Sequence, residues 1–597
     1  MASTLTRFQR LEENEVDSRP LDLGLIRRLY EYTRPYARKR NWLVVLVVVR
    51  SIQIPLLTWI IASVIKGPIA ERNAAGVAVG VAAFVVLVLL TQFTVHFRQR
   101  LALELGESVV RDMRGQLFAH LQQMPMSFFN RTKLGRIISR MTSDVEYVRM
   151  GVQEVFFGTV VLTGQMLISA LFMLWYDPML FLVVLGLAPV LWGINRHFSR
   201  RLAQGHRQVQ ESFSRVTATL AESVNGIRVT QGFVRQETNA EMFHELISDH
   251  AEHNFALSRT QGMFQRLLDL NNQVFIAALL LVGAWQVLSP HSTTEVGDVV
   301  GFFLMAGLFF SPVTVLGVEY NYALTAMAGA ERVFSLLDTV PDSFDSPTAA
   351  DITGIAGGVE FDRVTFGYDV DRPVLHNLSF EVKPGETVAL VGHTGSGKTS
   401  IVNLIAKFYV PTSGQVLIDG HEIRDIRTAS LRPQMAIVSQ HNFLFTGTVL
   451  DNIRVGRVEA SDEEVIEAAR RLDCLDIIEA LPEGFQTQVG ERGNSLSIGQ
   501  RQLVCFCRAM LADPAILFLD EATSSVDTVT EARVQKALAE LLRGRTSFVV
   551  AHRLSTIRHA DLVLVLEAGH IVERGKHLAL LAAGGHYAKL YRRFVAA

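Results

Sequence analysis

Six long apolar segments occupy the first part of the chain and constrain its fold more than any other feature. They cover residues 41–65, 75–97, 152–176, 178–195, 268–289 and 297–321. About 20 apolar residues let a helix cross the hydrocarbon core of a membrane, where backbone groups have no water to bond. We therefore expect six transmembrane helices. The rest of the chain alternates short apolar runs with glycine and charge, which predicts a soluble domain.

The positions of Lys and Arg predict how these spans are oriented. Basic residues crowd segments 27–40, 98–149 and 196–266, whereas the connections "WYDP" and "SPHSTTEVGD" contain none. Because basic residues near span ends stay on the cytoplasmic side, we expect both termini to face the cytoplasm. Pro178 is expected to open the fourth helix. The fifth segment, begun by "RLLDLNNQVF", is the weakest span and could instead be buried protein, which would place the C-terminal half outside.

The two long basic connections exceed the usual length of structureless loops, so we expect the membrane helices to extend far into the cytoplasm. We expect them to turn at "GRIISRMTSDVEYVRM" and "ESVNGIRVTQGFVRQE", although a solvated helix surface explains these segments equally well. Polar residues in or near the spans are candidates for substrate contacts or, equally, for packing contacts between helices. They are Gln53, Gln92, His96 and Glu319.

The soluble half contains a phosphate-binding motif. In "VALVGHTGSGKTS" an apolar β-branched run precedes G-x-x-x-x-G-K-T and a helix, which is the context of a P-loop. Its residues are Gly392, His393, Thr394, Gly395, Ser396, Gly397, Lys398, Thr399 and Ser400. The glycines let backbone amides converge on phosphate oxygens, and the helix N-terminus favours an anion. Lys398 is expected to reach the β- and γ-phosphates and Thr399 to bind Mg²⁺.

Two further apolar strands end in candidate catalytic residues. "AILFLDEATSS" delivers Asp520, expected to hold Mg²⁺ through water, and Glu521, expected to act as general base toward the attacking water. "FVVAHRL" ends in His552, a candidate γ-phosphate contact. Taken alone, a carboxylate pair is more often a solvated turn and a single histidine more often structural.

Composition excludes some other classes of function. The formal net charge of −2 shows no excess of positive charge that would indicate nucleic-acid binding. Cys474, Cys505 and Cys507 are odd in number and lack ligand-like spacing, which argues against a disulfide framework or a zinc site. The N-terminus is polar and lacks the short apolar segment and small-residue cleavage site of a signal peptide.

The segments "GHTGSGKT", "LSIGQRQ", "LFLDEATSSVD" and "VVAHRLST", in this order, are similar to the nucleotide-binding domain of an ABC transporter. With six spans before them, the chain resembles an exporter-type half-transporter of the kind found among bacterial multidrug exporters and lipid flippases. The resemblance implies an all-α six-helix transmembrane domain with long cytoplasmic extensions. It also implies an α/β P-loop NTPase domain with a helical subdomain, and a domain-swapped dimer.

The resemblance gives a role to "LSIGQ", the signature segment. In the family this segment closes over the nucleotide held by the partner's P-loop, which implies that Ser497 and Gly499 contact the γ-phosphate and that Gln500 lies beside them. The sequence departs from the family pattern at Ile498, where glycine is usual. A helix follows the segment, so its position at a helix N-terminus also suits an anion.

Further roles follow from the same resemblance. Tyr368 is similar to the aromatic residue that stacks on adenine, and Gln440 to the glutamine that senses Mg²⁺. Glu491 resembles a residue of the exporter-specific loop before the signature segment, and Asp527 resembles a residue of the loop that links the two sites. The segments 140–148 and 222–230, with Asp144 and Gly226, would be coupling helices.

Together these features predict an N-terminal segment with an interfacial helix at 1–40, a transmembrane domain at 41–325, a linker at 326–357 and a nucleotide-binding domain at 358–597. The implied function is ATP-driven export or flipping of a hydrophobic or amphipathic drug, lipid or peptide across a bacterial cytoplasmic membrane, with ATP and Mg²⁺ as cofactors. The implied partner is a second half-transporter, with a homodimer favoured. The alternatives are the competent half of a heterodimer, a membrane-tethered regulatory ATPase, and a channel or receptor.

Overall fold

The computed structural model describes residues 22–289, 294–341, 344–369, 371–440, 442–520, 528–550 and 554–596. These residues form two compact units. The first, the helical unit, comprises the chain up to Gln122 together with Gly135–Thr339. The second, the α/β unit, comprises Gln123–Leu134 and the chain from Val340 onward.

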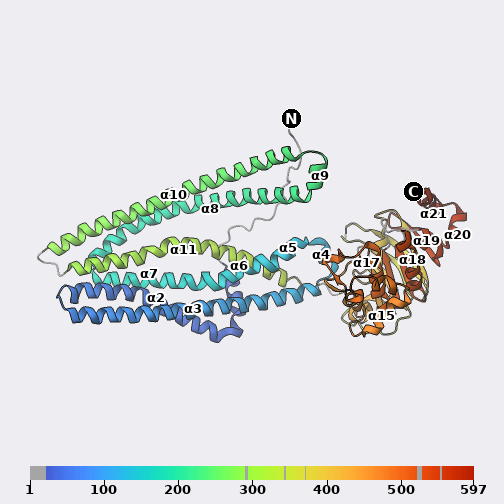
Figure 1. The fold of residues 1–597 in the computed structure, drawn as a ribbon, viewed down its shortest axis with the longest axis horizontal. Coiled ribbons are helices and arrows are strands. Elements are labelled where there is room, and N and C mark those ends of the chain that lie inside the picture. Colours follow the sequence, from blue (N-terminus) through green and yellow to red (C-terminus); the bar gives the residue numbers. More distant parts are fainter. Residues whose placement is uncertain are drawn as a thin grey trace. The chain divides into compact units, whose positions relative to one another are not determined.

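The helical unit is built from long helices that lie side by side (Figure 1). Its helices are α1 (Leu23–Tyr32), α2 (Ala37–Val64), α3 (Ala74–Gln123), α5 (Leu134–Ser139), α6 (Val145–Met150), α7 (Phe156–Tyr176), α8 (Pro178–Asn225), α9 (Ile227–Gly232), α10 (Gln236–Leu288) and α11 (Val296–Leu337). Single π-helical turns join some of these helices into continuous helical rods, at Ile65–Ile69, Arg140–Asp144 and Gly151–Val155.

Six of these helical stretches are long and apolar enough to cross a membrane, and each contains one predicted span. They are Arg34–Ile69, Ala74–Gln123, Leu134–Tyr176, Pro178–Asn225, Gln236–Leu288 and Val296–Leu337. The weak fifth segment meets the same criterion. Pro178 opens α8 as predicted, and Asp177 caps it by accepting hydrogen bonds from the amides of Met179 and Leu180. The last helix continues to Leu337, through the first part of the predicted linker.

The expected turn at "GRIISRMTSDVEYVRM" is wrong. Residues 135–150 belong to the rod formed by α5 and α6, and the chain turns just before them, around the short helix α4 (Met126–Arg131). The missed signal is Pro125, which caps α4 with extended backbone and disfavours helix in the residue before it. At the second expected turn, α8 ends at Asn225 and α9 lies between α8 and α10 (Figure 1).

The α/β unit contains three sheets. Its strands are β1 (Val359–Phe366), β2 (Leu375–Val382), β3 (Thr387–Gly392), β4 (Ser413–Ile418), β5 (His421–Glu422), β6 (Met435–Val438), β7 (Gly447–Thr448), β8 (Gln488–Val489), β9 (Ile516–Asp520), β10 (Thr546–Val550), β11 (Leu562–Glu567) and β12 (His570–Gly575). The largest sheet has the order β12-β11-β3-β10-β9-β6, and only β12 runs antiparallel to its neighbour. An antiparallel sheet has the order β2-β1-β4-β5, and β7 pairs with β8.

Helices flank these sheets and close two main apolar cores. They are α12 (Lys398–Ile405), α13 (Thr428–Leu431), α14 (Val449–Arg454), α15 (Asp462–Arg471), α16 (Leu475–Glu479), α17 (Ile498–Ala512), α18 (Thr528–Leu542), α19 (Leu554–His559), α20 (His577–Ala583) and α21 (His586–Ala596). One core joins the antiparallel sheet to α12 and the large sheet. The other packs α14, α15, α17 and α18 together, which gives the α/β unit a helical subdomain.

Candidate functional site

The site is organised by the carboxyl ends of four neighbouring parallel strands. In the large sheet Val550 of β10 pairs with Leu390 of β3 on one side and with Asp520 of β9 on the other. Leu519 of β9 in turn pairs with Val438 of β6. The loops after these strands therefore open at one sheet edge, where parallel α/β sheets bind ligands. The predicted residues Glu521, Asp527 and His552 lie outside the described residues.

The P-loop follows β3 directly and needs its glycines. Gly395 and Gly397 have φ of 83° and 105°, in the left-handed region that other residues rarely adopt. A Cβ on Gly392 would clash with the carbonyl oxygen of Leu566 and with Ser396, and one on Gly397 would clash with Leu375. The loop therefore keeps its backbone open immediately before α12, as binding of phosphate oxygens by amides requires.

Two buried polar groups in this loop fit an anionic ligand. The ammonium of Lys398 donates to the carbonyl oxygens of Gly392 (2.8 Å) and His393 (2.9 Å), so the side chain folds back across the loop. Burial lowers the pKa of Lys398, and the nearby charge of Asp520 offsets this only in part. The hydroxyl of Ser396 is buried and has no hydrogen-bond partner among the residues that the structure describes. A phosphate would supply both an acceptor and a counter-charge.

The predicted magnesium ligands lie at the same edge. Thr399 is exposed in the first turn of α12, Asp520 is half-buried at the end of β9, and Gln440 is exposed two residues after β6. Gln440 and Asp520 line one small cavity together with Gln502 of α17. Their side chains carry the oxygen atoms that Mg²⁺ prefers as ligands. Sequence reasoning missed Gln502, whose buried Oε1 has no hydrogen-bond partner in the described part of the chain.

Tyr368 is held at the other side of the P-loop helix. Its hydroxyl lies 3.0 Å from the Ser400 hydroxyl and accepts a hydrogen bond from the Asn403 amide at 3.2 Å. Its ring meets the Tyr409 ring edge-on, with centroids 5.0 Å apart. The exposed fraction of Tyr368 is 38%, so the residue remains accessible beside the loop.

The short helix α4 contacts these two tyrosines. Arg131 donates to the carbonyl oxygen of Tyr368 at 2.8 Å and to the Asp369 carboxylate at 3.2 Å. Asn130 donates to the Tyr409 hydroxyl at 2.8 Å. Sequence reasoning missed both residues because it placed the turn further along the chain.

The signature segment begins α17. Ser497 is the N-cap: its hydroxyl accepts from the Gln500 amide, and the Gln500 side chain accepts from the Ser497 amide at 2.9 Å. Gly499 is buried in the first turn. Ile498, the departure from the family pattern, is 39% exposed, so its side chain does not fill the interior of this chain.

Three further predicted residues lie far from the P-loop in the sequence: one in the loop before the signature segment and two in the expected coupling helices. Glu491 starts a short helical turn after β8, and Gly226 caps the C-terminal end of α8. Asp144 is buried in the helical unit, where Arg332 donates to its two carboxylate oxygens at 2.6 Å and 3.0 Å.

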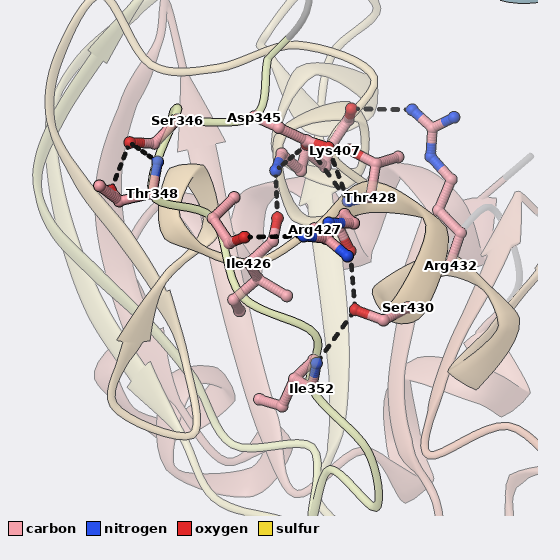
Figure 2. A network of polar contacts seen from close by, with 11 residues as sticks. Asp345, Ser346, Thr348, Ile352, Lys407, Ile426, Arg427, Thr428, Ser430 and Arg432 are labelled. Carbon is pink, nitrogen blue, oxygen red and sulfur yellow. Dashed lines mark hydrogen bonds and ion pairs between the residues drawn. The ribbon is translucent and has the colours of Figure 1, made fainter.

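A buried cation anchors the segment that enters the α/β unit (Figure 2). Lys407 is fully buried, and its ammonium donates to Asp345 (2.6 Å) and to the carbonyl oxygen of Ile426 (2.5 Å). Thr428 donates to the same carboxylate, and Arg432 donates to the carbonyl oxygen of Lys407. Burial opposes ionisation of Asp345, but hydrogen bonds from Lys407 and Thr428 outweigh it and lower the pKa of the carboxyl. The network lies just before β6, the strand that leads to Gln440.

Two family models match the chain. The ABC transporter transmembrane region matches residues 42–313, and the ABC transporter model matches residues 375–524. Together they cover most of the chain, in the order that the six spans and the P-loop predict.

Individual relatives span nearly the whole chain. The uncharacterized ABC transporter ATP-binding protein YknV of Bacillus subtilis is 38% identical over 98% of this chain and 97% of its own length. The ATP-dependent lipid A-core flippase of Syntrophus aciditrophicus is 35% identical over 96% and 94%. The fatty acid ABC transporter ATP-binding/permease protein of Mycobacterium tuberculosis is 37% identical over 82% and 77%.

A solved structure has the same fold. A bacterial Atm1-family ABC exporter with ATP bound superposes with a TM-score of 0.76 and is 26% identical, covering 93% of this chain and 98% of that chain.

Proposed function

We propose that this chain, which belongs to the ABC transporter family, uses ATP hydrolysis to export or flip an amphipathic substrate. Its fused membrane and ATP-binding regions make it an ATP-hydrolysing transporter of the exporter type. The observation that carries the proposal is the P-loop at one sheet edge with Asp520 and Gln440, in the same chain as six membrane-length helices. The named lipid A-core and fatty acid relatives support a lipid-like substrate.

We assign the site residues as follows. Lys398 and the P-loop amides bind the β- and γ-phosphates, and Tyr368 stacks on the adenine. Thr399, Gln440 and, through water, Asp520 hold Mg²⁺, which neutralises the charge of the phosphates. Glu521 accepts a proton from the attacking water, and His552 contacts the γ-phosphate.

The signature residues Ser497, Gly499 and Gln500 complete the site of a second copy of the chain. A homodimer is favoured because the chain has a full set of motifs, whereas a heterodimer would use it as the competent half. Closing the dimer around two ATP molecules can move the membrane helices between inward- and outward-facing states. Such a switch needs about 5.5 kcal/mol of differential binding to pass from 1:99 to 99:1.

The chain is a multi-pass membrane protein. The basic segments between spans support an orientation with both termini and the α/β unit in the cytoplasm. We propose the cytoplasmic membrane of a bacterium as its location, in agreement with the bacterial relatives.

Substrate-stimulated ATP hydrolysis and ATP-driven transport by the purified chain in proteoliposomes test this function. A fluorescent anionic lipid should move across the bilayer with ATP and Mg²⁺, and should not move with the Glu521→Gln variant. Hydrolysis that no amphiphile stimulates and that drives no transport would instead support a membrane-tethered regulatory ATPase.

A mixing experiment tests the composite sites. Homodimers of Ser497→Arg and of Lys398→Ala should both fail, the first because a bulky charge enters the site and the second because the phosphate contact is lost. In a mixed dimer both changes fall on one composite site, so the other site is intact and partial hydrolysis should return. Verified mixed dimers without recovery, beside an active wild-type/Lys398→Ala dimer, would contradict the arrangement.

A further inference from the structure

The first two membrane helices pair in a register that brings two arginines together. Helices α2 and α3 run in opposite directions side by side (Figure 1). Two side-chain contacts between α2 and α3 define their alignment: Lys39 with Glu104 (2.8 Å) and Gln53 with Thr94 (3.0 Å). Tyr36, which directly precedes α2, bonds to Asp112 in the same register (2.7 Å). This alignment places Arg50 opposite Arg98, one turn from the Gln53–Thr94 pair.

An apolar layer separates this arginine pair from the first residues of α2. Leu43, Val47, Ala102 and Leu105 are buried in one cluster between the two helices and α7. Arg50 lies on the far side of this layer within the first predicted span, 41–65, and Arg98 directly follows the second predicted span, 75–97. The arginine pair is therefore shielded along this seam by side chains that offer no hydrogen bond.

Several polar atoms at and beside the arginine pair have no hydrogen-bond partner among the described residues. Arg50 Nη1 and Arg98 Nε are buried without a hydrogen-bond partner, and so are Gln53 Oε1 and Thr91 Oγ1 on the same seam. Within the described part of the chain, neither guanidinium forms an ion pair with a carboxylate. Both arginines are half-buried. Removing part of the hydration of a charge without supplying a counter-charge is costly, and ionisable residues in or beside membrane segments commonly mark substrate paths.

We propose that Arg50 and Arg98 bind the carboxylate or phosphate group of the amphipathic substrate, whose hydrocarbon chain remains among apolar side chains. Guanidinium groups suit this role because each stays charged and can bind two oxygens of such an anion at once. Gln53 and Thr91 add uncharged hydrogen-bonding groups beside the anion. This inference rests on the proposed exporter function and narrows its substrate class to anionic amphiphiles.

The binding test compares probes that share one hydrocarbon chain and differ in charge. The full-length protein in nanodiscs is titrated with hexadecyl phosphate and with the neutral monohexadecanoylglycerol. The wild type should bind the phosphate at least about tenfold more tightly, because a hydrogen bond to a charged group exceeds a neutral one by roughly that factor. Arg50→Gln/Arg98→Gln should bring the two affinities close together.

Two further variants keep the test interpretable. Arg100→Gln is the matched control, because Arg100 lies on the same helix but is exposed and pairs with Glu104 at 2.9 Å. It should retain the preference for the phosphate. If the double variant does not fold, Arg98→Lys serves in its place. It keeps the positive charge but cannot form the bidentate hydrogen bonds of a guanidinium, so its preference for the phosphate probe should be intermediate. An unchanged preference in a folded double variant, or in Arg98→Lys where the double variant does not fold, would overturn the proposal.

A transport arm separates a substrate from a membrane lipid that merely borders the helices. ATP should drive hexadecyl phosphate across proteoliposome membranes with the wild type and with Arg100→Gln, but not with the double variant. If wild-type protein binds the probe and transports another amphiphile but not this one, the arginine pair holds a bordering lipid and the substrate assignment is wrong. Failure to transport any amphiphile would contradict the exporter function itself, while the binding preference would still report on the arginines.

Discussion

The two units of this protein differ in how many of their buried polar atoms have a hydrogen-bond partner. In the α/β unit the fully buried Lys407 has a carboxylate and a carbonyl oxygen as partners. In the helical unit the half-buried Arg50 and Arg98 each have one guanidinium nitrogen without a partner among the described residues, although the buried Asp144 is paired with Arg332. Of the eleven buried side-chain polar atoms without a partner among the described residues, nine lie in the helical unit, and the two in the α/β unit are Ser396 and Gln502.

This difference shows where a ligand or partner is needed. Among the described residues of the α/β unit, the buried side-chain atoms without a partner lie in the P-loop and in the cavity beside Asp520. The helical unit leaves polar groups unpaired along its membrane helices, where a substrate or a second subunit can complete them.

The largest expected effects come from changing ligand-facing residues of the α/β unit. Glu521→Gln should lower ATP turnover about a hundredfold or more while ATP binding persists, because the amide cannot act as a base. Lys398→Ala should weaken ATP binding itself, since it removes the buried ammonium from the P-loop. Parallel measurements of hydrolysis and nucleotide affinity check both changes. Near-normal hydrolysis by Glu521→Gln, or unchanged ATP affinity in Lys398→Ala, would remove that residue from its role.

Removing the counter-charge of the buried Lys407 should reduce ATP hydrolysis less than the changes above. It should, however, lower the stability of the α/β unit strongly. Asp345→Ala leaves the Lys407 ammonium buried without a counter-charge, which should destabilise the unit by about 3–5 kcal/mol. Lys407→Met should cost less, because it removes the charge together with the need to pair it. Thermal denaturation of the full-length chain compares the two. A larger loss in Lys407→Met would mean that the ion pair itself, rather than the unpaired charge, controls stability.

The contact of α4 with Tyr368 should have a smaller effect. Arg131→Ala removes an exposed ion pair with Asp369 and a hydrogen bond to the Tyr368 backbone, so ATP affinity should fall by no more than about fivefold. Arg363→Ala is the matched control, because Arg363 forms an exposed pair with Asp362 in the same unit. Equal ATP affinities in the two variants would show that α4 does not position Tyr368.

The smallest effect is expected at a satisfied polar pair of the helical unit. Thr94→Val removes the hydrogen bond from Gln53 and should lower stability by about 0.6 kcal/mol, the usual size between membrane helices. Thr58→Val is the control, because the Thr58 hydroxyl bonds only to its own helix. Melting temperatures in the same detergent measure the difference. A loss of stability as large as that of Asp345→Ala would contradict the proposed difference between the two units.

Local chemistry made much of the protein predictable. Apolar segments of sufficient length specify membrane helices wherever they occur, and Pro178 marks the start of α8 because its ring suits a first helical turn. The P-loop is equally local: Gly395, Gly397 and Lys398 are consecutive or nearly so, and their backbone conformations determine where the lysine reaches. The turn at α4 was also readable, from Pro125, although the glycine-containing segment after it gave a misleading signal.

The sequence by itself therefore determined the six membrane helices, the α/β domain and the phosphate-binding loop, because each depends on residues close together along the chain. Only the tertiary structure decided which distant residues meet. Lys407 forms an ion pair with Asp345, which lies 62 residues away in the sequence. Arg50 lies opposite Arg98 because α2 and α3 pair in one register. A shift of that register would separate the arginines without changing either helix, so no local pattern could reveal the pair. Packing between elements sets such contacts, and packing depends on the whole fold.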